Sequence, residues 1–239
     1  MISNSEANGS AERIGLWGGV GYALMMILGW WLVSGYLPPQ TPDAGAEDVA
    51  RFYRENFLTI RVGMVIVMFG GVLYAPFAAL AAKQIARVEG GVGVMTICQI
   101  MGGMAVVLLA FYPAIWSLSV AYRPERAPEF MQLINDAIWL QLIGGMPPFL
   151  LVLLSLGATA LKQDNGRDSR VPIFPRWYGY FSFLVGALML PRVLVFFYQS
   201  GPFAWDGLVG FWLSSAALLL WIVATTFVLR SAMFAPARS

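Results

Sequence analysis

The side chains of this sequence that could do chemistry are few, because it contains no histidine and a single cysteine, Cys98. Histidine-ligated haem, copper and zinc sites, cysteine-ligated iron–sulfur clusters and disulfide bonds therefore lack their ligands. Ser-His-Asp and Cys-His catalytic groups cannot be assembled either. We therefore expect no metal, no other cofactor and no disulfide, which excludes much of membrane redox enzymology.

One charged residue lies well inside an apolar segment: Arg192, in the stretch MLPRVLVFFYQSGPFAW. A charge inside a bilayer is costly, so such a residue is by default a functional candidate. Its distance from Ser200 along the chain places it about 12 Å from the end of its span, at about 1.5 Å per residue. Two roles are open. The guanidinium either binds an anionic ligand, or anchors the helix by reaching toward headgroups or pairing with Asp136 or Asp206.

The other candidates are polar side chains that hydrogen-bond well but are poor acids and bases. Away from the span ends we find no aspartate, glutamate, lysine or histidine, so the relay groups of a proton pump are missing. For a ligand site we predict Arg192, Arg61, Gln141, Tyr74 and Tyr112. For an enzyme, the acid–base groups would have to be the outer-loop carboxylates Glu55, Asp136 and Asp206. The polar residues predicted within the spans are Tyr74, Thr96, Gln99, Tyr112, Gln141, Ser155, Thr159, Ser214 and Ser215.

The elements that must position these residues are membrane-spanning helices. The chain is 59% hydrophobic and 12% charged, whereas soluble domains carry about 25% charged residues. A span needs about 20 apolar residues, and six segments satisfy this. We predict an all-α integral membrane protein with a transmembrane domain over 14–230 and with tilt or a bend near Pro113 in the third span. The six spans are expected at about 14–36, 60–82, 93–120, 138–161, 177–199 and 207–229.

The positive charges favour one orientation of these spans. Six spans form three hairpins and place both termini on one side. With the termini inside, the inner segments hold nine arginines and lysines and the outer loops five, which favours cytoplasmic tails at 1–13 and 231–239. The first helix lacks a small-residue cleavage site, so we expect it to be retained. We predict a bacterial cytoplasmic (inner) membrane as the location and, from the net charge of only +2, no nucleic-acid partner.

The outer loops contain two amphipathic stretches. TPDAGAEDVARFYRENF, over 41–57, begins with a threonine and proline typical of a helix start. RPERAPEFMQLINDAIW, over 123–139, leads into the fourth span. We predict in each a short helix that lies on the outer membrane surface or caps the bundle, the two together forming a lid, with a plain solvated connector as the alternative. Trp30, Trp31 and Tyr36 are expected in the outer interfacial belt.

Glycines and prolines within the spans concern packing. Small residues allow close helix approach in lipid, so the glycine pairs favour tight packing, either within the chain or as faces toward a protein partner or a second copy. Prolines remove a backbone donor and bend helices. Two arrangements fit these bends: an internal cavity or groove, or a bent but closed bundle. The pairs are Gly18 and Gly19, Gly70 and Gly71, Gly102 and Gly103, and Gly144 and Gly145; the prolines are Pro76, Pro113, Pro147, Pro148 and Pro191.

Three functions fit these patterns. The first is binding or passing a small hydrophobic or amphipathic molecule, with Arg192 meeting an anionic head in an outward-facing groove. The second is a cofactor-independent isomerase, cyclase or hydratase acting on a lipid-soluble substrate through the outer carboxylates. The third is a structural subunit of a larger membrane complex. The lipid bilayer is a partner in all three.

Overall fold

The computed structural model describes residues 4–163 and 173–233, which form helices joined by short connections, with no strand among them. Six of its helical stretches are long and apolar enough to cross a bilayer, and each overlaps one predicted span. This is consistent with a polytopic membrane protein. The elements are α1 (Asn4–Met26), η1 (Ile27–Val33), α2 (Ala46–Glu89), α3 (Val94–Tyr122), α4 (Pro128–Gly144), η2 (Pro147–Phe149), α5 (Leu150–Lys162), α6 (Arg176–Met189), η3 (Leu190–Phe196), η4 (Leu208–Leu213) and α7 (Ser214–Met233).

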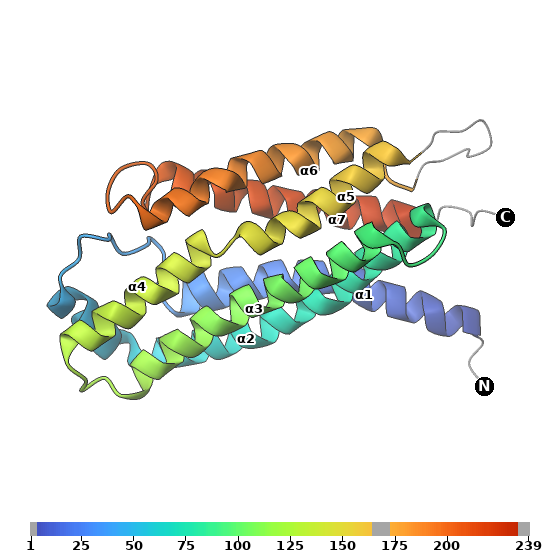
Figure 1. The fold of residues 1–239 in the computed structure, drawn as a ribbon. Coiled ribbons are helices and arrows are strands. Elements are labelled where there is room, and N and C mark those ends of the chain that lie inside the picture. The colour runs from blue at the N-terminus through green and yellow to red at the C-terminus, as the bar shows by residue number, and fades with distance from the viewer. Residues whose placement is uncertain (1–3, 164–172, 234–239) are drawn as a thin grey trace.

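The helices form an elongated bundle with two different ends (Figure 1). The start of α1, the end of α7 and the short turn between α2 and α3 lie at one end, which we call the turn end. The connections 34–45, 123–127 and 197–207 gather at the opposite end, which we call the loop end. The most extensive packing is between α2 and α3 and between α1 and α2, while α7 packs against α1 and α6. The helix α1 already begins at Asn4, inside the segment predicted as a polar tail, and residues 234–239 of the other tail lie outside the described residues.

The two outer-loop stretches form the first turns of spanning helices. They are not separate surface elements. Residues 46–57 belong to the uninterrupted helix α2. Its buried positions Val49, Tyr53, Ile60 and Met64 repeat at helical spacing, so one apolar stripe continues from the loop end into the bundle. The second stretch likewise enters α4, which begins at Pro128 and continues to Gly144. Both stretches are helical, and the second leads into the fourth span; the first is continuous with the second span and is not a separate helix.

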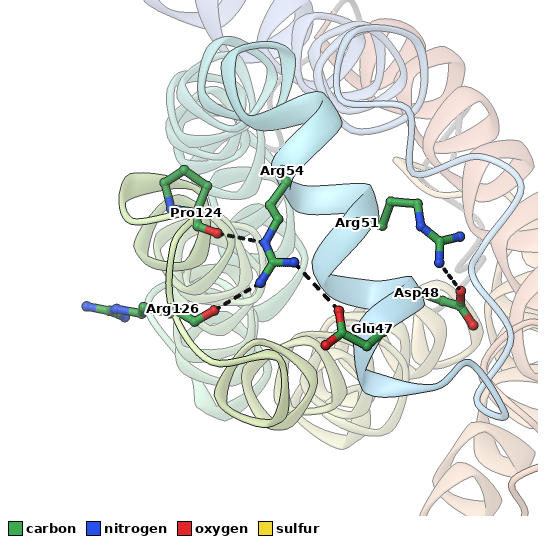
Figure 2. A network of polar contacts seen from close by, with 6 residues as sticks. All are labelled: Glu47, Asp48, Arg51, Arg54, Pro124 and Arg126. Atoms are coloured by element: carbon green, nitrogen blue, oxygen red, sulfur yellow. Dashed lines mark hydrogen bonds and ion pairs between the residues drawn. The ribbon is translucent and has the colours of Figure 1, made fainter.

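Polar contacts join these first turns to the neighbouring loop (Figure 2). Arg54 on α2 donates from Nε to the Pro124 carbonyl at 3.0 Å and from Nη2 to the Arg126 carbonyl at 3.4 Å. Its Nη1 lies 3.6 Å from the carboxylate of Glu47, while Asp48 and Arg51 form a separate ion pair at 3.1 Å. Because Arg54 donates hydrogen bonds to two backbone carbonyls of the α3–α4 loop, it attaches this loop to the start of α2.

The predicted glycine pairs pack inside the chain. All of these glycines except Gly145 are buried. A Cβ atom at Gly103 would lie 2.5 Å from Ala78 Cβ on α2, and one at Gly18 would lie 2.5 Å from the Leu73 carbonyl oxygen. Such separations require that no side chain be present. Since the pairs are used by neighbouring helices of the same chain, the predicted glycine faces toward a partner or a second copy are not free surfaces here.

The prolines divide into two groups. Pro76 and Pro113 lie within the continuous helices α2 and α3, so the third span is one helix and the hydroxyl of Ser117 donates to the Pro113 carbonyl at 2.9 Å. Pro147 and Pro148 begin the 3₁₀ segment η2, and Pro191 lies in the 3₁₀ segment η3. Only the second group interrupts α-helical geometry, and it does so beside the cavity described next.

Candidate ligand site

A cavity of about 130 Å³ lies within the bundle and is lined by all six spanning stretches. Its walls are predominantly apolar, with aliphatic and aromatic side chains and a few polar atoms. Pockets of this composition are typical of sites for small molecules that are largely hydrophobic. The lining residues used below are Tyr22, Ile27, Trp30, Tyr74, Arg192 and Ser215.

Every helical segment that departs from α-geometry contributes to this cavity. The π-helical segments η1 and η4 provide Trp30 and Phe211, and the 3₁₀ segments η2 and η3 provide Phe149 and Arg192. In η1, the amide and the hydroxyl of Ser34 both donate to the Gly29 carbonyl, at 3.2 and 2.7 Å. Irregular turns of this kind occur frequently at functional sites. Their convergence on one cavity is an observation independent of its residue types.

Arg192 is buried, with 3% of its surface exposed, and it caps the end of α4. Its Nε donates to the Ile143 carbonyl at 3.2 Å and its Nη2 to the Leu142 carbonyl at 3.3 Å. In a continued α-helix the Ile143 carbonyl would accept from residue 147, but that residue is a proline without an N–H. The guanidinium replaces the missing donor and places positive charge at a helix C-terminus, where it is favourable.

No carboxylate of the described residues forms an ion pair with Arg192. The predicted pairing with Asp136 or Asp206 is therefore absent, and backbone carbonyls take that place. Nη1 makes only a 3.8 Å contact with the Met189 sulfur. Each terminal nitrogen carries two N–H groups, so each keeps one free. The cavity wall thus contains a cation without a counter-ion among the described residues.

Three residues of the cavity lining also carry donors that make no hydrogen bond within the described residues. The hydroxyl of Tyr74 and the indole N–H of Trp30 are buried and make no hydrogen bond, and the structure gives none for the Tyr22 hydroxyl within the described residues. The rings of Tyr22 and Tyr74 pack edge to face with centroids 5.0 Å apart. Arg192 and Tyr74 were among the predicted ligand residues; Tyr22 and Trp30 were not.

The other predicted ligand residues lie elsewhere. Arg61 donates to the carbonyl oxygens of Ala121, at 3.0 and 2.7 Å, and of Tyr122, at 3.0 Å, so it caps the end of α3. Gln141 is half-buried on α4, and its backbone carbonyl accepts a hydrogen bond from the Gly145 amide at 3.0 Å. Tyr112 is 45% exposed on the outside of α3. None of these three residues lines the cavity.

The carboxylates considered for acid–base chemistry are also outside the cavity lining. Glu55 is exposed on α2, and Asp136 on α4 and Asp206 in the 197–207 loop are half-buried. Partial burial and the nearby charge of Asp43 raise the pKa of Asp206. No group of three potential metal ligands occurs in the described part of the chain.

An aromatic cluster of Trp30, Tyr36, Trp139, Trp205 and Phe211 lies on the loop-end side of the cavity. Trp139 is fully buried, and its ring contacts those of Trp30, Trp205 and Phe211 at centroid distances of 6.4, 6.4 and 6.2 Å. The hydroxyl of Tyr36 donates to that of Tyr53 at 2.7 Å. Trp30 and Tyr36, expected at the lipid interface, are therefore interior residues, and aromatic rings bound the cavity on this side.

Comparison with known proteins gives this cavity no precedent: no family model, no curated protein and no solved structure matches the chain.

Proposed function

We propose that this polytopic membrane protein binds or passes a small amphipathic molecule with an anionic head, and that the central cavity holds it. The observation that supports this most directly is the buried guanidinium of Arg192 in an apolar wall, with free N–H groups and no ion pair to any carboxylate that the structure describes. An unpaired buried charge is strongly destabilising. An anionic group in the cavity would offset that cost, and the apolar walls would hold the rest of the molecule.

Capping of α4 does not by itself explain why a charged arginine occupies position 192. Capping α4 requires donors, which a neutral glutamine or asparagine also supplies. A permanent positive charge adds a desolvation cost that capping does not need. The lining tyrosines and Trp30 add unpartnered donors to the same wall. These features together favour an anion as the missing partner.

Native mass spectrometry of the protein in mild detergent, followed by identification of retained small molecules, tests the proposal. We expect one anionic amphiphile per chain in the wild type. Ser215→Phe fills the cavity from α7 and should abolish retention, whereas Ser231→Phe, on the exposed surface of the same helix, should not. Arg192→Gln keeps donors for the Leu142 and Ile143 carbonyls but removes the charge, so it should lose the molecule while remaining folded.

Two results would overturn the proposal. One is a wild-type protein that carries no small molecule. The other is a molecule retained equally by Ser215→Phe and Ser231→Phe, because it would then be bound outside the cavity. A co-purifying protein in its place would support the structural-subunit alternative.

A further inference from the structure

The polar atoms of the cavity that lack partners are mainly donors. The free N–H groups of Arg192 can only donate, and the hydroxyls of Tyr22 and Tyr74 make no hydrogen bond within the described residues. The Leu142 and Ile143 carbonyls already accept from Arg192. A ligand that satisfies this wall must therefore accept several hydrogen bonds close together.

The charge of the wall limits the ligand further. Arg192 supplies one positive charge, and no carboxylate or second cation of residues 4–163 and 173–233 lines the cavity. One negative charge on the ligand would give a neutral buried pair, whereas a dianionic phosphate ester would leave an uncompensated charge in an apolar site. A carboxylate has a single charge and about four acceptor positions on two oxygens. These match the two free guanidinium N–H groups and the two phenol hydroxyls.

The size of the cavity also excludes bulky amphiphiles. A volume of about 130 Å³ is close to the roughly 150 Å³ of an engineered apolar cavity that binds benzene, so it has room for a short single-chain molecule but not for a two-chain phospholipid. Apart from the polar atoms, its lining includes Ile27, Leu218 and Leu219, which offer aliphatic contact to a hydrocarbon part.

We infer that the ligand is a single-chain monocarboxylate whose head accepts hydrogen bonds from Arg192, Tyr22 and Tyr74, with its hydrocarbon part against the aliphatic wall. This inference rests on the proposed function, since it identifies the chemical class of the molecule in the same cavity. The edge-to-face packing of Tyr22 and Tyr74 fixes both rings, so their hydroxyls are held in place before the ligand arrives. Such preorganisation reduces the entropy cost of binding.

Chain-matched probes test the head group directly. Octanoate, octyl phosphate, octanol and octylammonium are titrated against the protein in phosphatidylcholine nanodiscs, with butanoate and dodecanoate to cover chain length. We expect saturable one-to-one binding of a carboxylate, with octyl phosphate and octanol at least about tenfold weaker and octylammonium not bound.

Removing single hydroxyls tests the residues. Tyr22→Phe and Tyr74→Phe keep the rings and should each weaken carboxylate binding by about tenfold, because each removes one hydrogen bond to a charged group. Tyr112→Phe removes a hydroxyl outside the cavity lining and should leave binding unchanged. Equal weakening by all three variants would overturn the assignment of the head site.

The outcomes separate this inference from the proposal beneath it. Tighter binding of octyl phosphate than of every carboxylate overturns the monocarboxylate assignment and leaves an anion-binding cavity. Equal binding of octanol and octanoate shows that the head charge is not recognised, and it too overturns the inference. If no probe binds the wild type more strongly than the Ser215→Phe variant, both the inference and the proposed function fail.

Discussion

At the residue scale, two arginines perform the same helix-capping chemistry in different surroundings. Arg192 and Arg61 both donate to carbonyl oxygens at a helix end. The last carbonyl groups of a helix have no partner within the helix. Arg61 is half-exposed and stacks on Phe57 and Tyr122, with its guanidinium carbon 5.3 and 5.7 Å from the ring centroids. Arg192 is buried and faces a cavity. The difference in surroundings, and not in hydrogen bonding, is the reason we propose a ligand for Arg192 and none for Arg61.

Arg61→Ala therefore should destabilise the protein without affecting ligand retention. We expect a loss of about 1.5 kcal/mol, the lower end of the range for hydrogen bonds to a charged group, because the site is half-exposed. Thermal unfolding in detergent followed by tryptophan fluorescence measures this loss. Arg51→Ala, which breaks only an exposed ion pair on the same helix, should change stability by less than about 0.5 kcal/mol. An Arg61→Ala protein of wild-type stability that loses the ligand would return Arg61 to the binding site.

At the scale of elements, the bundle combines close packing in one part with irregular helices in another. The contact between α2 and α3 is the most extensive in the chain, and Gly103 lies within it. The 3₁₀ and π-helical segments instead gather around the cavity. Since irregular turns satisfy backbone groups less well than an α-helix does, the closely packed helices must provide the stability that the cavity region lacks.

Adding one methyl group at Gly103 tests that division. A Cβ there would lie 2.5 Å from Ala78 Cβ, so Gly103→Ala should destabilise by about 1–3 kcal/mol through overpacking. At Gly186 the nearest atom would be Leu153 Cδ1 at 3.7 Å, an ordinary contact. Gly186→Ala should therefore stabilise by up to about 1 kcal/mol through its higher helix propensity.

A compensating substitution makes the packing explanation specific. Combining Gly103→Ala with Ala78→Gly moves the methyl group across the same interface, so it should recover much of the lost thermal stability. The two changes contact each other and should be strongly non-additive. Additive destabilisation in the double variant would contradict the close approach of α2 and α3 at this point.

At the scale of the whole molecule, the sequence predicted what hydropathy determines and missed what packing determines. Six apolar runs predicted six spanning helices, because every backbone group in lipid must be satisfied within its own helix. The sequence could not show that α2 begins well before the apolar run, since its amphipathic first turns resemble a surface helix. Arg192 was found because a charge in an apolar run is conspicuous. Trp30 was missed because an aromatic residue near a span end is equally typical of the lipid interface. Tyr22 was missed because a tyrosine in the middle of an apolar run does not show which face of the helix it lies on.

The irregular helices were beyond prediction for a related reason. A π-helical segment such as η1 carries no distinctive composition, and it depends on contacts such as those of Ser34 with Gly29. Prolines correctly indicated the interruptions at η2 and η3, yet Pro76 and Pro113 lie within α2 and α3 without interrupting them. Whether a proline interrupts a spanning helix depends on how neighbouring groups satisfy the freed carbonyl, and this is a property of the packed bundle.

The orientation of the molecule in the membrane can be measured because Cys98 is the single cysteine. In a Cys98→Ser background, one new cysteine is placed at Glu125 or Ser200 at the loop end, or at Val92 or Ser231 at the turn end, all of them exposed. From the distribution of arginine and lysine we expect a membrane-impermeant maleimide to label the first two in intact bacterial cells. The other two should react only after the membrane is opened.

This orientation decides how a ligand reaches the cavity. With the loop end outside, the aromatic cluster lies between the cavity and the external face, so we expect Trp139 to move when a molecule passes in that direction. Trp139→Ala should then speed the release of bound octanoate from nanodiscs, measured by dilution, while Trp177→Ala, at an exposed position near the turn end, should not. The reverse labelling pattern would place the aromatic cluster on the cytoplasmic side and contradict the predicted topology. Equal release rates for the two tryptophan variants would instead show that the ligand leaves by a route that does not cross the cluster.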